Sequence, residues 1–494
     1  MRQRAFFLFV TGILAAAPQM FAQQPGVQSG SDSDAIKIGD VTVSGWLRTR
    51  SESWDWFKGN ANNQYTFSES IFRLSFSENT ETFDWQIELA VPFLLGLPNN
   101  AIAPGAQGQL GFGGSYYANS KASNTASIFP KQVYGRFKFG SGNVKQSILF
   151  GRSEFFDGGE VTPKNTTLAA VKKDRIMQRL IGNFGFADVA RSFDGGVYSM
   201  DTARTNVTVF GSRPTRGVFQ VDGWNEVNVD VFYGAITRQV GGDKNSGEWR
   251  VFSIGYNDYR GGVLKTDNRP QTVRAADHGS IDIATIGGHY IHALKTEAGT
   301  FDFLLWGALQ GGSWGTLTQR AGAFAGEAGW QFPILPRVKP WLRGGYNYGS
   351  GDKNPNDRTH GTFFQMLPTA RQYARFPFFN MMNNRDVFGE LLLRPAKSVT
   401  VRTDIHSLAL ANKNDLWYQG GGVFQPWTFG FTGRPSNGQT GLATLYDASV
   451  DYTLNRHFAF GVYYGYAAGK LVIQEIYPNG KNANLGYIEG NYRF

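Results

Sequence analysis

The sequence predicts an all-β fold, a transmembrane antiparallel β-barrel of about 18 strands with short turns at one end and long loops at the other. Three observations lead to this prediction: an export signal, segments of about ten residues that alternate apolar and polar side chains, and connections that alternate in length. The mean hydropathy of -0.31 argues against a helical membrane protein, whereas barrel strands dilute each apolar residue with a polar one. Cysteine is absent, which excludes a disulfide framework and a thiolate metal site.

The N-terminus is typical of a cleaved signal peptide. Arg2 and Arg4 precede an apolar run from Ala5 to Ala17 that is too short to span a bilayer. A short anchor helix is the alternative. Cleavage would lower the formal net charge from +9 to +7, because both arginines and no acid lie before the cut. The predicted organisation is a signal peptide at 1–22, a short periplasmic segment at 23–39 and an outer-membrane β-barrel at 40–494.

Period-2 alternation is the main evidence for strands. In the segment from Val338 to Gly349, Leu342 and Tyr346 share one face while Lys339 and Arg343 share the other. No apolar run after the signal is long enough for a transmembrane helix. The predicted strands are 40–52, 65–78, 82–91, 131–139, 145–153, 193–200, 203–213, 226–238, 248–258, 281–294, 301–312, 321–332, 338–349, 386–395, 398–410, 441–454, 457–474 and 484–494.

The connections between these segments alternate short and long. Asp201-Thr202 and Ala396-Lys397 are tight turns, whereas 154–192, 350–385 and 411–440 are long loops. An even strand count with short periplasmic turns and long outer loops is typical of a bacterial outer-membrane barrel, and a soluble sandwich has no reason to sort its loops this way. Loops 154–192 and 350–385 are candidates for folding inward as a plug or lid.

The last strand carries a second targeting feature. Tyr492 and Phe494 share one face of a strand that ends at the carboxyl terminus. This pattern is similar to the signal that the outer-membrane insertion machinery reads, and the alternative is an edge strand of a soluble sheet. Other aromatic residues cluster near strand ends and are expected to form girdles at the lipid headgroups: Trp46, Trp54, Trp56, Tyr65, Trp330, Phe332, Trp341, Tyr346, Tyr348, Tyr463, Tyr464 and Tyr466.

The charged faces of the strands are expected to line the lumen, because a charge in mid-bilayer costs about 2–4 kcal/mol. An arginine can clamp a carboxylate with two hydrogen bonds, which favours a carboxylate-bearing solute; the alternative is that each arginine pairs with a lumen acid and stiffens the barrel. Arg152, Arg250 and His289 lie on strands without a clean polar face and stay unassigned. The predicted lumen bases are Arg48, Arg50, Arg73, Arg136, Lys138, Arg204, Arg343, Arg394 and Arg402, and the acids are Glu69, Asp84, Glu88, Asp230, Asp302, Glu327, Glu390, Asp404, Asp447 and Asp451.

Other groups of residues are weaker candidates for a metal or catalytic site. Asp352, Asn354, Asn356 and Asp357 have the oxygen density of a calcium loop but lack its glycine and terminal glutamate, so a solvated turn is the competing interpretation. His406-Ser407 is a possible start of a hydrolase dyad without a nucleophile elbow. The positive charge is spread along the chain, which argues against a nucleic-acid partner. No catalytic residue and no cofactor is predicted.

The run Gly349 to Asp357 (GSGDKNPND), with the GRSE motif at 151–154 and RSFDG at 191–195, resembles the alginate-export family of outer-membrane porins. The resemblance implies an 18-stranded barrel whose arginine-rich constriction passes an anionic polyuronate. The sequence departs from the pattern expected of this family in two ways: the segment ARQYARFPFFNMMNNRD after Thr369 is unusually aromatic, and the predicted lumen acids are as numerous as the bases.

The expected function is therefore a passive outer-membrane channel, a monomer in contact with lipid, for an anionic polysaccharide or acidic sugar. Nine residues are the candidate pore-lining set: Arg48, Arg50, Arg73, Arg136, Lys138, Arg343, Arg394, Arg402 and Asp404. A general small-solute porin without acid preference is the alternative, and a barrel enzyme using His406 is the alternative from another class.

Overall fold

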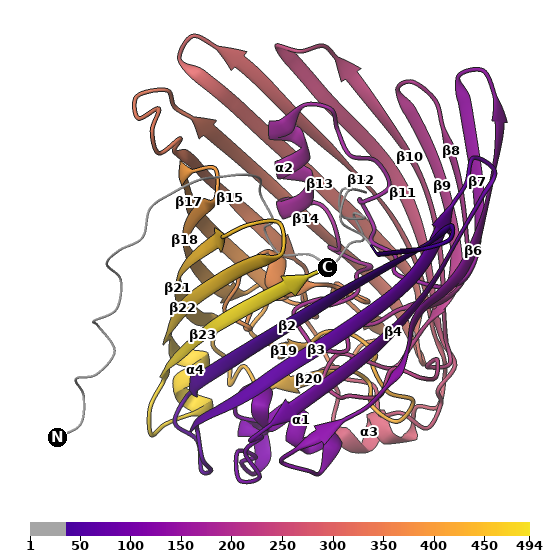
Figure 1. Ribbon diagram of the computed structural model, residues 1–494. Helices are drawn as coiled ribbons and strands as arrows, with labels where there is room; N and C mark the ends of the chain where they lie inside the picture. Colours follow the sequence, from indigo (N-terminus) through magenta and orange to yellow (C-terminus); the bar gives the residue numbers. More distant parts are fainter. Residues whose placement is uncertain (1–35) are drawn as a thin grey trace.

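The computed structural model describes residues 36–494 and shows a closed β-barrel around a filled interior (Figure 1). The predicted signal peptide lies outside the described residues. Eighteen long strands form the wall. They are β2 (Val41–Asp55), β3 (Gln64–Asn79), β4 (Phe83–Leu95), β6 (Phe129–Ser141), β7 (Val144–Ser153), β8 (Phe193–Asp201), β9 (Thr205–Pro214), β10 (Val229–Gly241), β11 (Asn245–Asp258), β12 (Ile281–Thr296), β13 (Gly299–Trp314), β14 (Leu317–Gln331), β15 (Trp341–Gly349), β17 (Asn384–Ala396), β18 (Val399–Leu410), β21 (Gly441–Thr453), β22 (Phe458–Gly469) and β23 (Asn482–Arg493).

The remaining elements are short and lie at the barrel ends or inside. None of the helices in residues 36–494 is long and apolar enough to cross a membrane. These shorter elements are the strands β1 (Ile36–Ile38), β5 (Thr125–Ala126), β16 (Thr359–His360), β19 (Trp417–Gly420) and β20 (Phe431–Arg434), the helices α1 (Phe112–Ser120), α2 (Thr166–Arg175), α3 (Gln271–Ala276) and α4 (Leu471–Ile476), and the 3₁₀ turns η1 (Gly105–Gln107) and η2 (Ala370–Gln372).

Every predicted strand corresponds to one wall strand. Neighbours in the chain pair antiparallel, and β23 closes the barrel on β2 with Trp46 opposite Arg493. The predicted strand 457–474 is too long, because β22 ends at Gly469 and the chain turns into α4. β1 lies in the segment 23–39 that was predicted to be periplasmic, and it pairs with the first residues of β2. Short connections gather at one end of the barrel, here called the turn end, and α1, α3 and α4 mark the opposite loop end (Figure 1).

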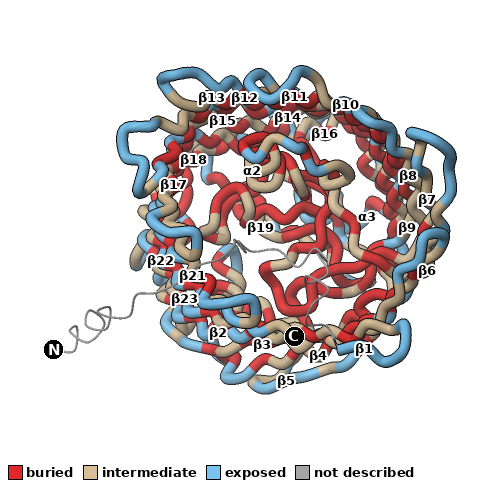
Figure 2. The backbone as a smooth tube through the Cα atoms, turned by 45° about the horizontal axis from the view of Figure 1, so that its top comes forward, coloured by how far each residue is buried: buried red, intermediate tan, exposed pale blue. Residues whose placement is uncertain are grey.

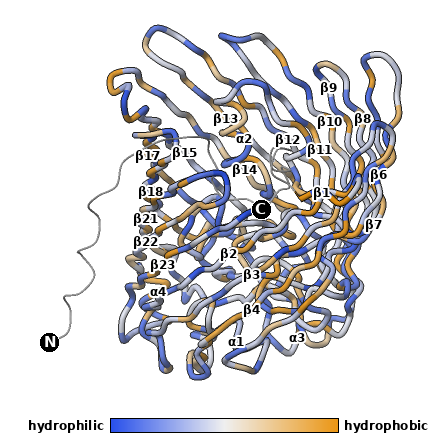
Figure 3. The backbone as a smooth tube through the Cα atoms, in the orientation of Figure 1, coloured by the Kyte–Doolittle hydropathy of each residue, from blue (hydrophilic) through white to orange (hydrophobic). Residues whose placement is uncertain are grey.

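The two faces of the wall follow the pleat. On β13, Leu305 and Leu309 are 63% and 72% exposed on the outside, while Leu304 and Trp306 are buried on the inside. Apolar and polar residues succeed one another along the wall strands in Figure 3. The outer face therefore presents apolar side chains to lipid, and the charged face looks inward, as the sequence predicts.

The predicted aromatic girdles are only partly correct. Trp330, Tyr346, Tyr348, Tyr464 and Tyr466 lie on the outer face, where Phe324 packs against two of these tyrosines with ring centres 5.6 and 5.4 Å apart. Phe332 follows the end of β14 and packs 5.0 Å from the Trp330 ring. The remaining six face the interior because they share the parity of the lumen residues on their strands, or leave the strand into a loop packed inside. The inward aromatics are Trp46, Trp54, Trp56, Tyr65, Trp341 and Tyr463.

The terminal residue completes the seam between β23 and β2. The backbone N–H of Phe494 donates to the Gly45 carbonyl at 3.0 Å, and that of Gly45 donates back at 2.9 Å. The Phe494 ring lies where a side chain at position 45 would be, since a Cβ there would come within 2.2 Å of it. Tyr492 packs 6.0 Å from the same ring. The role of these two residues in membrane insertion stays a prediction.

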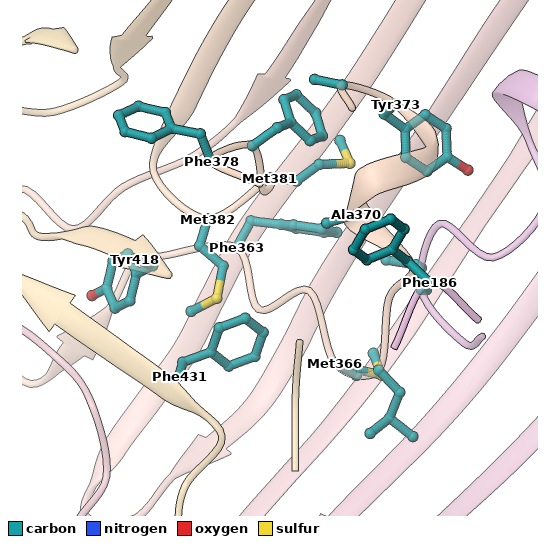
Figure 4. Close-up of a cluster of buried hydrophobic side chains, with 14 of the residues drawn as sticks. Phe186, Phe363, Met366, Ala370, Tyr373, Phe378, Met381, Met382, Tyr418 and Phe431 are labelled. Carbon is teal, nitrogen blue, oxygen red and sulfur yellow. The ribbon is translucent and has the colours of Figure 1, made fainter. Parts of the chain in front are cut away.

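Long loops fill the lumen. The loops 154–192, 350–383 and 411–440 run through the centre of the barrel as mostly buried chain (Figure 2). Their apolar side chains pack with inward-facing wall residues such as Leu304 and Trp306 in one continuous core, in which Phe186, Phe363 and Tyr418 come from three different loops (Figure 4). A barrel of this many strands is too wide for wall side chains to fill, so the loops supply the packing. We call these three loops the plug.

Candidate pore constriction

All nine predicted pore-lining residues lie on the inward face of the wall. Two residues of the wider lumen prediction do not. Arg204 is exposed in the turn between β8 and β9. Asp230 faces outward on β10, where its carboxylate accepts from Arg213 Nε at 2.6 Å. The predicted strand 203–213 begins two residues before β9, so Arg204 falls in the turn. On β10 the inward face carries the apolar residues Val229, Val231 and Tyr233, so the polar side chain of Asp230 points outward.

Most of the predicted wall bases are paired with acids. Arg50 contacts Glu52, Glu69 and Glu489, with its Nε 2.9 Å from the last of these. Arg73 donates to Glu88 at 2.7 Å, and Arg343 donates to Asp302 and Glu327. Arg136 and Lys138 share Asp84 at 3.7 and 3.0 Å. These pairs neutralise much of the wall charge and hold neighbouring strands together.

Further ion pairs attach the plug to the wall. In α2, Lys172 Nζ lies 2.7 Å from Glu248 on β11, and Arg175 donates to Glu327 on β14 at 2.9 Å. Arg250, unassigned from sequence, lies 3.5 Å from Asp157 of the plug. His289, also unassigned, lies 3.1 Å from Glu248. The side chain of Asn165 caps the N-terminus of α2. The contacts of Lys172, Arg175 and Asp157 therefore join the plug to β11 and β14.

Two cavities flank the plug. The loop-end cavity, about 220 Å³, is lined by Phe112 of α1, Gln419 of β19 and Arg434 of β20. The turn-end cavity, about 130 Å³, lies between the plug and strands β2, β22 and β23. Arg371, in η2 of the plug, lines both cavities. This side chain therefore lies where the two cavities approach each other.

Basic side chains dominate the turn-end cavity. Its lining contains seven bases but three acids, which are Asp174, Asp451 and Glu489. Burial alone would raise the pKa of Asp174, but Arg402, Lys173 and Arg375 bring it below its ordinary value. The carboxyl is therefore ionised and sits in a cationic environment. The bases are Arg48, Arg50, Lys173, Arg371, Arg375, Arg402 and Arg493.

Arg371 contacts aromatic rings in place of a carboxylate. Its guanidinium carbon lies 3.6 Å from the ring centre of Phe186, and Arg50 approaches the same ring at 3.7 Å. Nη2 donates to the Tyr487 hydroxyl at 3.5 Å, and Nη1 has no hydrogen-bond partner among residues 36–494. Arg371 is 7% exposed, so this N–H group is buried without a hydrogen-bond acceptor in the described residues.

Sequence reasoning missed the plug bases Lys173, Arg371 and Arg375. A signal for two of them exists in ARQYAR (370–375), where arginines four residues apart stand in an aromatic segment. Of the predicted set, Arg48, Arg50 and Arg402 reach the turn-end cavity, and Arg402 also pairs with Asp174 at 2.9 Å. Loop residues can be assigned to a lumen only when the path of the loop is known.

The two weaker candidate sites have structural explanations. Asp352, Asn354 and Asp357 accept backbone N–H groups two residues ahead, at 3.0, 3.1 and 2.7 Å, and so form a ladder of Asx turns that includes Asn356 as a donor. His406 and Ser407 point to opposite faces of β18, and the Ser407 hydroxyl accepts from Lys470. Ser407 is therefore not positioned as a nucleophile for His406.

The fold is similar to that of solved outer-membrane channels. OccK9 (OpdG) of Pseudomonas aeruginosa aligns at 10% identity and a TM-score of 0.53, and OccAB2 of Acinetobacter baumannii at 11% and 0.55. OpdK of P. aeruginosa, solved with vanillate, aligns at 8% and 0.50. Each alignment covers 92% of this chain and 98% of the other.

Sequence comparison identifies the family. No curated protein sequence matches the chain. The profile of the family described as alginate export matches residues 172–483, which contain most of the wall strands and the plug arginines. The chain therefore belongs to the alginate export family, and it is a β-barrel channel of the bacterial outer membrane.

Proposed function

We propose that this channel passes anionic, carboxylate-bearing sugars or acidic polysaccharides, and that Arg371 is the residue each carboxylate meets at the narrowest point. The observation that carries the proposal is the buried Arg371 guanidinium, which lines both cavities and has an Nη1 without a hydrogen-bond partner in the described chain. An arginine fork can hold a carboxylate with two parallel hydrogen bonds. The wall arginines are less available, because acids already occupy them.

The turn-end cavity supplies further weak sites along the route. Arg375 and Arg402 lie beside Arg371 in the same lining, so a carboxylate released by one base remains close to the next. Conduction needs several shallow sites, because a single deep site would trap the solute. OpdK, a channel of the same fold, was solved with vanillate, which carries a carboxylate. The direction of transport follows from the gradient in a passive channel.

A general small-solute porin is the second candidate, and the near balance of acids and bases on the wall favours it. Glu390, Asp404, Asp447 and Asp451 form an acidic belt across β17, β18 and β21. In such a channel, the plug arginines would pack the lumen without selecting the solute. The two functions differ in ion selectivity and in block by a polyuronate.

The experiment is a reversal-potential measurement in a planar bilayer under a KCl gradient, repeated with an oligouronate. We expect anion selectivity and concentration-dependent block in the wild type. Arg371→Gln should weaken the block at least tenfold. Arg213→Gln is the matched control, because it removes the same charge from the outer rim, where Arg213 pairs with Asp230. Equal block in both variants, or none in the wild type, would refute the proposal.

A further inference from the structure

Three buried side chains converge on the inner face of the wall, close to the plug. Asp404 and His406 are two residues apart on β18, and Asp447 lies directly opposite Asp404 on β21. One ligand atom from each of the three residues lies within 4.8 Å of the other two. Asp404, His406 and Asp447 are 8%, 1% and 3% exposed. The strand register alone brings them together, so the arrangement is rigid.

The surrounding groups orient these side chains and leave atoms free. Nδ1 of His406 lies 3.1 Å from both carboxylate oxygens of Asp386 on β17, which leaves Nε2 for another partner. The Tyr463 hydroxyl donates to Oδ1 of Asp447. The Phe388 ring stacks on His406 with centres 5.4 Å apart. A carboxylate behind a histidine fixes the tautomer and ring position that a metal ligand requires.

Two carboxylate oxygens in this cluster have no partner in the described residues, namely Oδ1 of Asp404 and Oδ2 of Asp447. A buried polar atom without a hydrogen bond is costly, and an unpaired buried carboxylate is more so. Arg375 donates to Ser449 on β21, Arg402 pairs with Asp174 and Glu390, and Arg371 packs against the rings of Phe186 and Tyr463. None of these arginines donates a hydrogen bond to either oxygen. A bound cation would satisfy both of these oxygens.

We propose that Asp404, His406 and Asp447 bind a divalent transition-metal ion, with Zn²⁺ as the representative, through Nε2 of His406 and one oxygen of each aspartate. One imidazole and two carboxylates suit such an ion, whereas calcium takes six or more oxygen ligands. Asp386 and Tyr463 are positioning residues that act through His406 and Asp447. The proposal does not depend on which solute the channel passes.

The competing interpretation is that His406 is an imidazolium ion that neutralises the acids without a metal. Its contact with Asp386 is compatible with an ion pair of this kind. The two interpretations differ in metal content, because an imidazolium has no lone pair for a metal ion. They also differ in response to Asp404→Asn, which removes a proposed ligand but not the Asp386 contact.

The test uses the full-length channel, purified in detergent, treated with a chelator and dialysed against buffered Zn²⁺. Elemental analysis should find one tightly held zinc per wild-type chain. Asp404→Asn and Asp447→Asn should each weaken zinc binding at least tenfold. Asp451→Asn is the matched control, because Asp451 lies on the same strand and face as Asp447 but outside the cluster. Equal binding by wild type, both ligand variants and control would overturn the proposal.

X-ray absorption at the zinc edge provides a second readout, whose decisive spectrum is that of the wild type. We expect one imidazole nitrogen with oxygen ligands, and loss of the imidazole signal in His406→Gln. A wild-type zinc shell without imidazole would overturn the site even if a ligand variant failed to fold. Circular dichroism of each variant establishes that the barrel is intact before metal content is compared.

Discussion

At the scale of single residues, Asp415 couples two loops of the plug through one buried carboxyl group. It accepts from the Thr362 hydroxyl at 2.6 Å, the Tyr418 hydroxyl at 2.7 Å and the Asp352 backbone N–H at 2.8 Å. Burial raises the pKa of Asp415 to about 6. The group therefore titrates within the range of pH at which a channel can be recorded.

This pKa predicts a plug that is held more firmly in acid. Since the folded pKa lies above the unfolded value of 3.8, the contribution of Asp415 is complete below about pH 4 and is lost as the pH rises through about 6. A shift of about two units corresponds to about 3 kcal/mol at most. Single-channel recordings should show more frequent current fluctuations at pH 8 than at pH 5.

Asp415→Asn should reduce this pH dependence, because the amide does not titrate. Asp357→Asn is the control, since Asp357 is an exposed acid on a plug loop. Fluctuations that change equally with pH in the wild type and in Asp415→Asn would show that another group is responsible.

At the scale of elements, one arginine fastens the three plug loops to one another. Arg191 is fully buried, and its guanidinium donates to the carbonyls of Gly182 and Leu367 at 2.9 and 3.0 Å and to that of Gly421. These carbonyls belong to the loops 154–192, 350–383 and 411–440. Arg191 therefore organises the plug without pairing with any acid in these contacts.

Replacing Arg191 with Met should loosen the plug and leave the wall intact. Each hydrogen bond from a charged donor contributes about 1.5–3 kcal/mol, and the losses do not add fully, so we expect about 3–5 kcal/mol. Limited proteolysis should cut the loops sooner, and single-channel conductance should rise. Arg238→Met, at an exposed turn-end position, should change neither. Unchanged proteolysis and conductance in Arg191→Met would show that the plug does not depend on this residue.

The contrast between wall and plug explains what sequence could predict. The strands were predictable because period 2 is a local signal, and Leu305 and Arg343 reveal their faces through their immediate neighbours. The lining of the turn-end cavity was predictable only where it lies on the wall, as at Arg48 and Arg402. Arg371 reaches the constriction through contacts far away in the chain, such as Arg191 with Gly421, and no local pattern encodes them.

At the scale of the whole molecule, the arrangement of charge matters more than its sum. The formal net charge of +9 includes many bases that acids neutralise locally, such as Arg343 beside Asp302 and Glu327. We therefore expect selectivity to depend on the bases without an acid partner that line the two cavities, and Arg371 lines both. Distant or paired bases act on a permeating ion only through the long-range field of the lumen.

The difference between distant or paired bases and the base in direct contact with the ion predicts how selectivity changes with salt concentration. The Debye length falls from about 30 Å at 0.01 M to about 3 Å at 1 M, so high salt screens distant charges and spares direct contacts. The ratio of anion to cation permeability should fall severalfold between these salt concentrations. It should then level off at a value above one. Arg371→Gln should remove the preference that remains at 1 M, because this side chain contacts the ion directly. Arg136→Gln should lower the preference only in dilute salt, since Arg136 lies at the turn end with its side chain 38% exposed. A preference at 1 M that survives Arg371→Gln would place the selective contact elsewhere in the lumen.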